Sequence, residues 1–219
     1  MRRTWILRGA GALLLAAGLV AGSCIPQDHK LNIPYRAQEQ FNYCTPAAVL
    51  MWRLYDGLVT VSQTTIFNWM GGTGNTNQIN VANAVNYFTN TRDAYWDSGS
   101  PTTYRQMAAR QITAFDRSIP SIVVINYDHV VIVNGGSWHT DPNYRVWDEV
   151  FAHDPDPFWG ANRYFSAGSW IYSFCPPGNR YCDQIISSGA TYDWSTNYTT
   201  YNDTKIYGWD HDLGGPLPY

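Results

Sequence analysis

Four polar side chains have the types and the chain order of a nucleophilic site that acts on carbonyl groups. Cys44 comes just before a segment with helical periodicity, where the unpaired N–H groups and the dipole of a starting helix favour a thiolate over a thiol. Gln38, six residues earlier, can donate an amide N–H to the oxyanion that forms when the sulfur attacks a carbonyl carbon. His129 is the best placed of the five histidines to act as a base, because it opens a Val/Ile-rich stretch, and Asp154 can orient its ring.

Each of these positions also has a purely structural interpretation. A lone cysteine can be a buried thiol, and a histidine at the start of a strand can simply bond to the backbone. Asp154 can be a turn-capping aspartate before a proline, and Asp156 competes with it for the orienting role. Gln40 competes with Gln38, but only Gln38 has the six-residue offset from the cysteine.

A second set of residues has the types found among metal ligands. Their spacing matches none of the tight zinc or calcium patterns, and Asp-Pro turns account for the carboxylates without a metal. The glycines between residues 71 and 77 match neither a phosphate loop nor a dinucleotide fingerprint. We therefore expect no metal and no cofactor. The candidate ligands in this set are His139, Asp141, His153, Asp154 and Asp156.

The elements that must position the site follow from the spacing of apolar residues. A run at i, i+3, i+4 and i+7 from Ala47 predicts a helix that starts at Thr45-Pro46 and ends at Gly57. Helices followed by an antiparallel sheet predict an α+β domain. Further helices are predicted over 62–70, 77–88 and 104–116, and strands over 31–35, 121–126, 129–134 and 144–152.

The strand that His129 opens is predicted to form a hairpin with the strand before it. Tyr127-Asp128 is a suitable turn between the two antiparallel strands, and Gly135-Gly136 is predicted to end the second one. This hairpin would hold the histidine at its turn.

The N-terminus has the pattern of an exported protein. Basic residues precede an apolar run over 9–20, which is shorter than the roughly 20 residues that a membrane-spanning helix needs. The stretch from Val20 to Cys24 resembles the lipobox of bacterial lipoproteins, in which the cysteine becomes the lipidated first residue, although Ala21 stands where Leu is usual. The alternative is ordinary cleavage and release as a soluble protein.

The cysteines and the composition fit export and exclude some partners. Cys175 and Cys182 bracket a turn-forming Pro-Pro-Gly stretch, so we expect them to pair in an oxidising compartment and to leave Cys44 as the odd thiol. A hydrophobic fraction of 45% with a net charge of −3 excludes a disordered chain. The chain has two lysines and no basic cluster beyond its first residues, which argues against a nucleic-acid partner.

The surroundings of the cysteine and the histidine resemble a known family. Residues 33–38 (IPYRAQ) and 42–48 (NYCTPAA) are similar to the nucleophile region of papain-like cysteine peptidases of the bacteriocin-processing, double-glycine leader peptidase type. Residues 119–124 and 128–133 are similar to the strand pair that carries that family's histidine, 153–155 (HDP) to its Asp-Pro motif, and 158–170 to the segment that closes its domain.

Two departures refine this resemblance, which covers about residues 31–174. The 85 residues between Cys44 and His129 favour a compact bacterial form over papain itself. Thr45 stands where many relatives have Gly.

The resemblance implies a papain-like α+β fold and a cysteine-type hydrolase that cleaves peptide or isopeptide bonds. Cys44 would be the nucleophile, His129 the base, Asp154 the orienting residue and Gln38 the oxyanion donor. We expect a peptide or protein substrate and a monomer held in the bacterial cell envelope by a lipid anchor. The alternatives are a thiol acyltransferase with the same residues and a non-catalytic surface lipoprotein that binds a wall polymer or a protein.

The predicted organisation has four parts. They are a signal peptide over 1–23, a linker over 24–30, a papain-like domain over 31–174, and an aromatic-rich C-terminal extension over 175–219.

Overall fold

A computed structural model describes residues 27–72, 78–99, 104–126, 128–141, 144–176 and 182–187 of the 219-residue chain. The predicted signal peptide, the lipidation site Cys24 and the part of the C-terminal extension after residue 187 lie outside these residues. The helices are α1 (Cys44–Tyr55), α2 (Gln63–Trp69), α3 (Gln78–Phe88), α4 (Tyr104–Asp116) and α5 (Ala167–Phe174). The strands are β1 (Gln27–Lys30), β2 (Ala94–Gly99), β3 (Ser121–Ile125), β4 (His129–Asp141), β5 (Tyr144–His153), β6 (Arg163–Ser166) and β7 (Cys182–Ser187).

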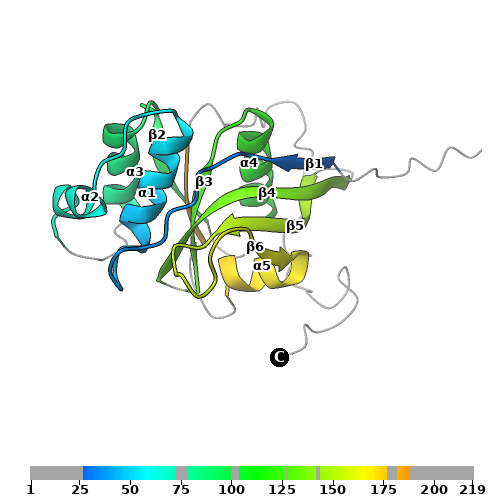
Figure 1. Ribbon diagram of the computed structural model, residues 1–219. Helices are drawn as coiled ribbons and strands as arrows, with labels where there is room; N and C mark the ends of the chain where they lie inside the picture. Colours follow the sequence, from blue (N-terminus) through cyan, green and yellow to red (C-terminus); the bar gives the residue numbers. More distant parts are fainter. Residues whose placement is uncertain are drawn as a thin grey trace, which may run out of the picture.

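The strands form one sheet in which every described pairing is antiparallel. Its order is β2-β7-β3-β4-β5-β6, and β1 pairs with β4 outside this path. Figure 1 shows α1, α2 and α3 gathered at one end of the molecule and α5 beside β5 and β6. The predicted α+β class, with helices packed on an antiparallel sheet, is confirmed, as are the helices predicted over 62–70, 77–88 and 104–116.

Helix α1 is the centre of the core. All its residues from Cys44 to Trp52 are buried, and it packs against β4, α2 and α3. It ends at Tyr55, and Gly57, the predicted stop, follows two residues later with a φ of +73°, a conformation that glycine adopts without strain. A helix enclosed on this many sides holds its first residue in a fixed place.

Helix α1 begins earlier than the sequence predicted. Its first residue is Cys44 and its N-cap position is Tyr43, so Thr45 is not the N-cap. Pro46 is tolerated as the third helical residue, because N–H groups in the first turn have no acceptor within the helix. The shift moves the cysteine from a flanking loop into the first turn of the helix.

Two strand predictions near the site are wrong. Residues 31–35 form no strand, and the strand of this region is β1, in the segment predicted to be a linker. Gly135-Gly136 does not end β4, which continues to residue 141. A Cβ atom on Gly136 would collide with the carbonyl oxygen of Glu149, so this glycine permits a close approach of β5 inside the sheet.

The predicted hairpin of β3 and β4 is present. Val123 lies opposite Val131, and Ile125 opposite His129 at the turn. Asn126 adopts a φ of +50° as the chain leaves β3, and its N–H donates to the carbonyl oxygen of Ser173 in α5. The turn that carries the histidine is therefore tied to a neighbouring helix.

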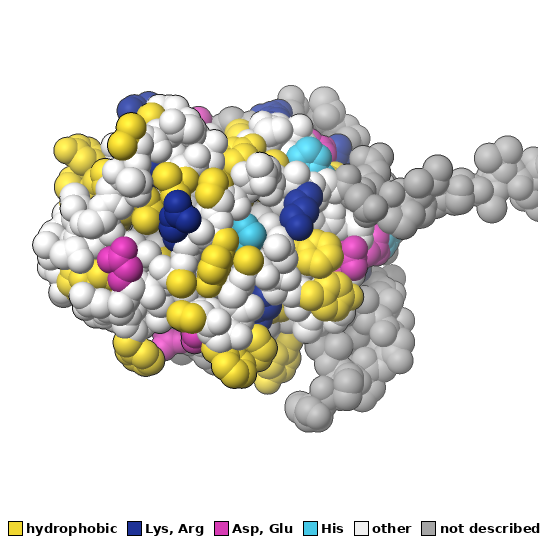
Figure 2. Space-filling model, in the orientation of Figure 1, with side chains coloured by type: hydrophobic (Ala, Val, Ile, Leu, Met, Phe, Trp, Pro, Cys, Tyr) yellow, Lys and Arg dark blue, Asp and Glu magenta, His cyan; other side chains and the backbone are white. Residues whose placement is uncertain are grey.

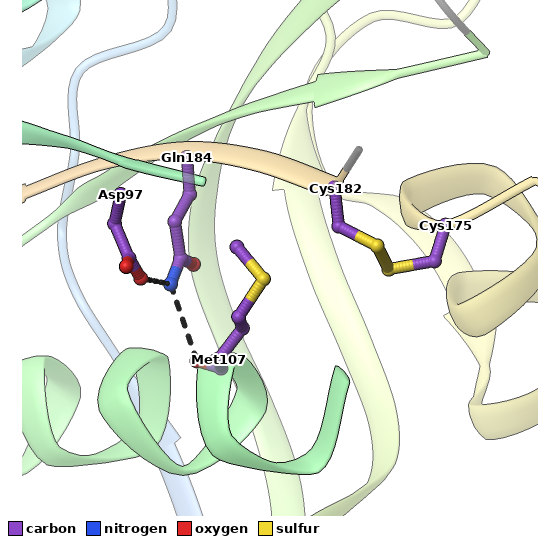
Figure 3. The surroundings of a disulfide bond; sticks show 5 residues. All are labelled: Asp97, Met107, Cys175, Cys182 and Gln184. Carbon is purple, nitrogen blue, oxygen red and sulfur yellow. Dashed lines mark hydrogen bonds between the residues drawn. A yellow bond between two sulfur atoms is a disulfide. The ribbon is translucent and has the colours of Figure 1, made fainter. Parts of the chain in front are cut away.

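Strand β7 lies inside the sheet, between β2 and β3, although it belongs to the segment predicted to follow the papain-like domain. It pairs with β2 along its length and with β3 at Ile185 and Gln184. The predicted disulfide between Cys175 and Cys182 is present and joins the end of α5 to the start of β7 (Figure 3). The buried Gln184 side chain donates to Asp97 of β2 and to the Met107 carbonyl oxygen of α4.

None of the described helices is both long enough and apolar enough to span a membrane.

Candidate active site

Cys44 lies at the N-terminus of α1 with its side chain almost enclosed. The residue is 7% exposed, and it is the free cysteine of the described part of the chain. The preceding turn is closed by two backbone bonds, from the Tyr43 N–H to the Gln40 carbonyl oxygen and from the Ala47 N–H to the Tyr43 carbonyl oxygen. The helix and this turn thus fix the backbone on both sides of Cys44.

His129 reaches the cysteine from the start of β4. The Cys44 thiol is among the groups that raise the pKa of His129, so the two side chains lie close together although they are 85 residues apart in the chain. On its other side, Nε2 of His129 donates to Oδ1 of Asp154 over 2.6 Å. The bond to the carboxylate leaves Nδ1 as the ring nitrogen available to the thiol.

Asp154 is fully buried, and both of its oxygens have partners. Oδ1 accepts from His129 and from the Asp156 N–H at 2.9 Å, and Oδ2 accepts from Nη1 of Arg163 at 2.6 Å. Burial raises the pKa of Asp154, but the bonds from His129, Arg163 and the Asp156 N–H outweigh it and bring the pKa below 3.8. The carboxylate is therefore ionised at neutral pH.

The charge of His129 follows from these partners. Burial lowers its pKa, but hydrogen bonds with Asp154 and Cys44, together with their charges, outweigh the burial and raise the pKa from 6.5 to about 9. At neutral pH the ring is an imidazolium between a carboxylate and the sulfur. Such a ring can give its proton to a leaving group.

Asp156, the competitor of Asp154, serves a different purpose. Its Oδ1 accepts the Phe158 N–H at 2.9 Å, and its carbonyl oxygen accepts the N–H groups of Trp159 and Gly160. These bonds close the loop between β5 and β6. Of the two aspartates, the structure brings Asp154 to the histidine and uses Asp156 as the turn-capping residue.

Gln38 lies on a segment whose backbone is hydrogen-bonded to two other parts of the chain. Its backbone N–H donates to the Pro155 carbonyl oxygen at 2.8 Å, directly after Asp154. The buried side chain of Gln63 donates to the Ala37 carbonyl oxygen at 2.7 Å and accepts the Glu39 N–H at 2.9 Å. This segment therefore joins the start of α2 to the loop that carries the aspartate.

The side-chain amide of Gln38 is partly used. Its Nε2 donates to the Phe41 carbonyl oxygen at 3.1 Å, whereas its Oε1 is buried without a partner in the described structure. A primary amide has two N–H groups, so one remains for a ligand while the other orients the side chain. Gln40, the other candidate, is exposed, and its carbonyl oxygen accepts the N–H of Tyr43.

The candidate metal ligands do not gather around one point. His139 bonds to Asp148, and His153 bonds to the Ile33 carbonyl oxygen and the Asn162 N–H. Within the described ranges no group of three or more His, Cys, Asp or Glu side chains is arranged to hold a metal ion.

Two residues that the sequence analysis missed support the site. Arg163 binds Asp154, and Gln63 holds the backbone on both sides of Gln38. Neither sits in a recognisable pattern around the cysteine or the histidine. For Arg163 the one available signal was the alternation of β6, which places an arginine two positions before the buried Phe165.

Comparison with known proteins places the chain among peptidases. The sequence model described as the Peptidase_C39 like family matches residues 30–173, a range that includes Cys44, His129 and Asp154. No curated protein matches the chain in sequence.

Solved structures with a similar chain path are distant in sequence. One is a double glycine motif protease from an AMS/PCAT transporter, in complex with the leader peptide, with 14% identity, a TM-score of 0.47, and coverage of 73% of this chain and 95% of that chain. Another is the peptidase domain of Streptococcus ComA, a bi-functional ABC transporter, with 15% identity, a TM-score of 0.44, and coverage of 72% and 96%. UfSP from C. elegans has 11% identity, a TM-score of 0.48, and coverage of 74% and 34%.

Proposed function

The chain belongs to the Peptidase_C39 like family, and from that premise we propose that it is a cysteine peptidase that cleaves peptide or isopeptide bonds. The observation that carries the proposal is the position of His129, which lies beside the Cys44 thiol and is hydrogen-bonded to the buried Asp154. A nucleophile, a base and a group that orients the base are the parts that acyl transfer requires.

The reaction we propose begins with the thiolate of Cys44 opposite the imidazolium of His129. The sulfur attacks the carbonyl carbon, and the oxyanion accepts from the free N–H of Gln38 Nε2 and from the Cys44 backbone N–H, which in the first helical turn has no acceptor within the helix. The C–N bond then breaks as His129 gives its proton to the amine. Water, deprotonated by His129, attacks the thioester carbonyl, which releases the acid and restores the thiolate and the imidazolium.

Two features of the described surface are compatible with a peptide substrate that carries few charges. On the face shown in Figure 2, charged side chains are few and scattered, and apolar side chains lie between them. Phe41, three residues before Cys44, is 98% exposed, and Phe158, in the loop after Asp154, is 81% exposed. Exposed aromatic side chains of this kind are available for contact with a bound peptide.

The proposal is tested by cleavage of a peptide library by the wild type, C44A and C44S. We expect cleavage by the wild type and none by either variant, and faster alkylation of Cys44 by iodoacetamide than of a free thiol between pH 5 and 8. Alkylation at the rate of a free thiol, with no cleavage, would contradict the peptidase proposal and favour the non-catalytic lipoprotein. Products joined to an added amine would instead indicate an acyltransferase.

The oxyanion role of Gln38 has a matched control two residues away. We expect Q38A to lower the rate of peptide cleavage by roughly 100-fold, because one preorganised donor to the oxyanion is lost, and to leave the alkylation rate of Cys44 unchanged. Q40A should change neither rate. Equal cleavage by Q38A and Q40A would remove Gln38 from the mechanism.

We also propose export and lipid anchoring through Cys24, supported by the lipobox-like stretch and by the disulfide between Cys175 and Cys182, which fits an oxidising compartment. Mass spectrometry of the membrane fraction should find a lipidated N-terminal Cys24. The variant C24S should lose this modification, and an unmodified soluble wild type would contradict the anchor.

A further inference from the structure

Arg163 occupies an unusual position for an arginine next to a reactive centre. Its Nη1 donates to Oδ2 of Asp154 at 2.6 Å, and its side chain is only 16% exposed. The guanidinium group lies over the ring of Trp159, 4.0 Å from the centroid, and over the ring of Phe165, at 4.7 Å. Two aromatic rings therefore hold the cation against the carboxylate that faces His129.

The two carboxylate oxygens of Asp154 bind different partners. Oδ1 accepts from His129 and from a backbone N–H, and Oδ2 accepts from Arg163. Without the arginine, a fully buried oxygen would lose its charged donor, and a carboxyl group relieves such a loss by rotating or by taking up a proton. Either change would weaken the bond that orients the histidine.

We propose that Arg163 is a positioning residue of the reactive site, which keeps Asp154 ionised and holds its Oδ1 towards His129. The proposal rests on the proposed function only in taking Cys44 and His129 as the reactive pair. Arg163 itself touches neither the thiol nor the histidine in any described contact, so its effect passes through Asp154.

The charged groups around Asp154 decide in which direction the loss of Arg163 shifts its pKa. His129 and Arg163 are the cationic partners, whereas Asp156 is a like charge and the Tyr35 phenol is neutral at ordinary pH. The bond from Arg163 is one of the causes that lower the pKa of Asp154 against its burial. Removing that bond therefore raises the pH at which Asp154 takes up a proton.

The aromatic contacts explain why an arginine stands at this position. A guanidinium is planar, stacks on rings and stays charged, whereas an ammonium is more strongly hydrated and does not stack. Lysine at this position keeps the charge but loses the contacts with Trp159 and Phe165. We expect it to restore the ionisation of Asp154 only in part.

The test is the pH dependence of Cys44 alkylation by iodoacetamide, which needs no peptide turnover. In R163M we expect the acid limb of the profile to move to higher pH by about one unit, which lowers the rate on that limb about tenfold. R163K should lie between R163M and the wild type. The control R145M removes an exposed arginine–aspartate pair, Arg145 with Asp116, and should leave the profile unchanged.

A double-mutant comparison isolates the path through Asp154. In the D154N background, R163M should produce no further shift, because the carboxyl group on which the arginine acts is absent. Coincident acid limbs for folded R163M and the wild type would overturn the proposal, and so would an equal shift in the D154N background. These outcomes do not depend on whether the wild type cleaves peptides, so failure of the peptidase proposal is distinguishable from failure of this one.

A measurement on the wild type keeps the proposal open to refutation if R163M does not fold. Carbon-13 NMR titration of the Asp154 carboxyl should show that it stays ionised below pH 3.8, with no change when the Arg145 control substitution is present. Protonation of Asp154 at or above pH 3.8 would overturn the proposal.

Discussion

Two histidines lie close to Asp154, the partly buried His129 and the buried His153, and their partners make one cationic and the other neutral. His129 contacts the Asp154 carboxylate and the Cys44 thiol, and its pKa is raised to about 9. His153, the neighbour of Asp154 in the chain, donates from Nε2 to the Ile33 carbonyl oxygen and accepts the Asn162 N–H at Nδ1. Burial is the main cause that lowers the pKa of His153.

The comparison shows that partners, rather than burial, decide which histidine carries charge. Burial acts against protonation at both positions. At His129 an ionised carboxylate outweighs it. At His153 a second ring proton would point at the N–H of Asn162, so the surroundings satisfy the neutral ring and disfavour the cation. One histidine is thus prepared for proton transfer, and the other ties the segment before α1 to the sheet.

The largest expected difference between the two histidines is in peptide cleavage. We expect H129Q to lower kcat by roughly 10²–10⁴-fold, because the thiol loses its base. H153Q should leave kcat within a few-fold of the wild type and lower the free energy of unfolding by about 1–3 kcal/mol, because buried bonds are lost. Cleavage kinetics and urea unfolding of both variants test this, and an equal loss of kcat in the two would break the comparison.

The two histidines should also give opposite slopes of stability against pH. The raised pKa of His129 stabilises the fold fully below pH 6.5, and this stabilisation, up to roughly 3 kcal/mol, is lost as the pH rises towards 9. The lowered pKa of His153 has the reverse effect, so stability falls as the pH drops below 6.5. Asp154 also has a lowered pKa, so it too makes stability fall as the pH drops, but only below pH 3.8.

Urea unfolding between pH 5 and 9.5 measures these slopes. H129Q should flatten the alkaline side of the profile, and H153Q should flatten the acid side. Slopes that persist unchanged in the matching variant would show that other groups produce them.

Removal of the Asp154 carboxylate should make the charge state of His129 resemble that of His153. In D154N we expect the pKa of His129 to fall from about 9 towards or below 6.5, because burial is then opposed only by Cys44. The alkaline limb of Cys44 alkylation should move down by about one to two pH units. D156N is the control, because Asp156 caps the loop and does not contact the histidine in the described structure. A limb that stays near pH 9 in D154N would contradict the assigned partner.

The smallest effect is expected at the partner of His153. That histidine accepts from the backbone N–H of Asn162, so N162G keeps the bond, loses the side-chain contact with Asn134 and relieves a φ of +56°. We expect a change in stability of at most about 1 kcal/mol and unchanged cleavage. Titration of His153 by NMR should still show a pKa below 6.5, and a raised pKa would mean that the asparagine side chain holds the ring neutral.

Much of the fold was predictable because its signals are local. Apolar periodicity predicts α2, α3 and α4, and the two Val/Ile runs around residue 127 predict the β3–β4 hairpin. The pairing of Cys175 with Cys182 follows from a short turn between them. Strand β7 was missed because its place depends on β2 and β3, which lie far from it in the chain, and because its surroundings in the sequence are dominated by polar and aromatic residues.

The sequence by itself determined the residue types of the candidate site and their order along the chain, since Gln38, Cys44, His129 and Asp154 stand in motifs that can be read without a structure. Tertiary structure alone decided which aspartate meets the histidine, and that Arg163 binds the far side of its carboxylate. The reason is physical. Hydrogen bonds and charges act over a few ångströms in space, and only the folded sheet brings these distant residues within that range.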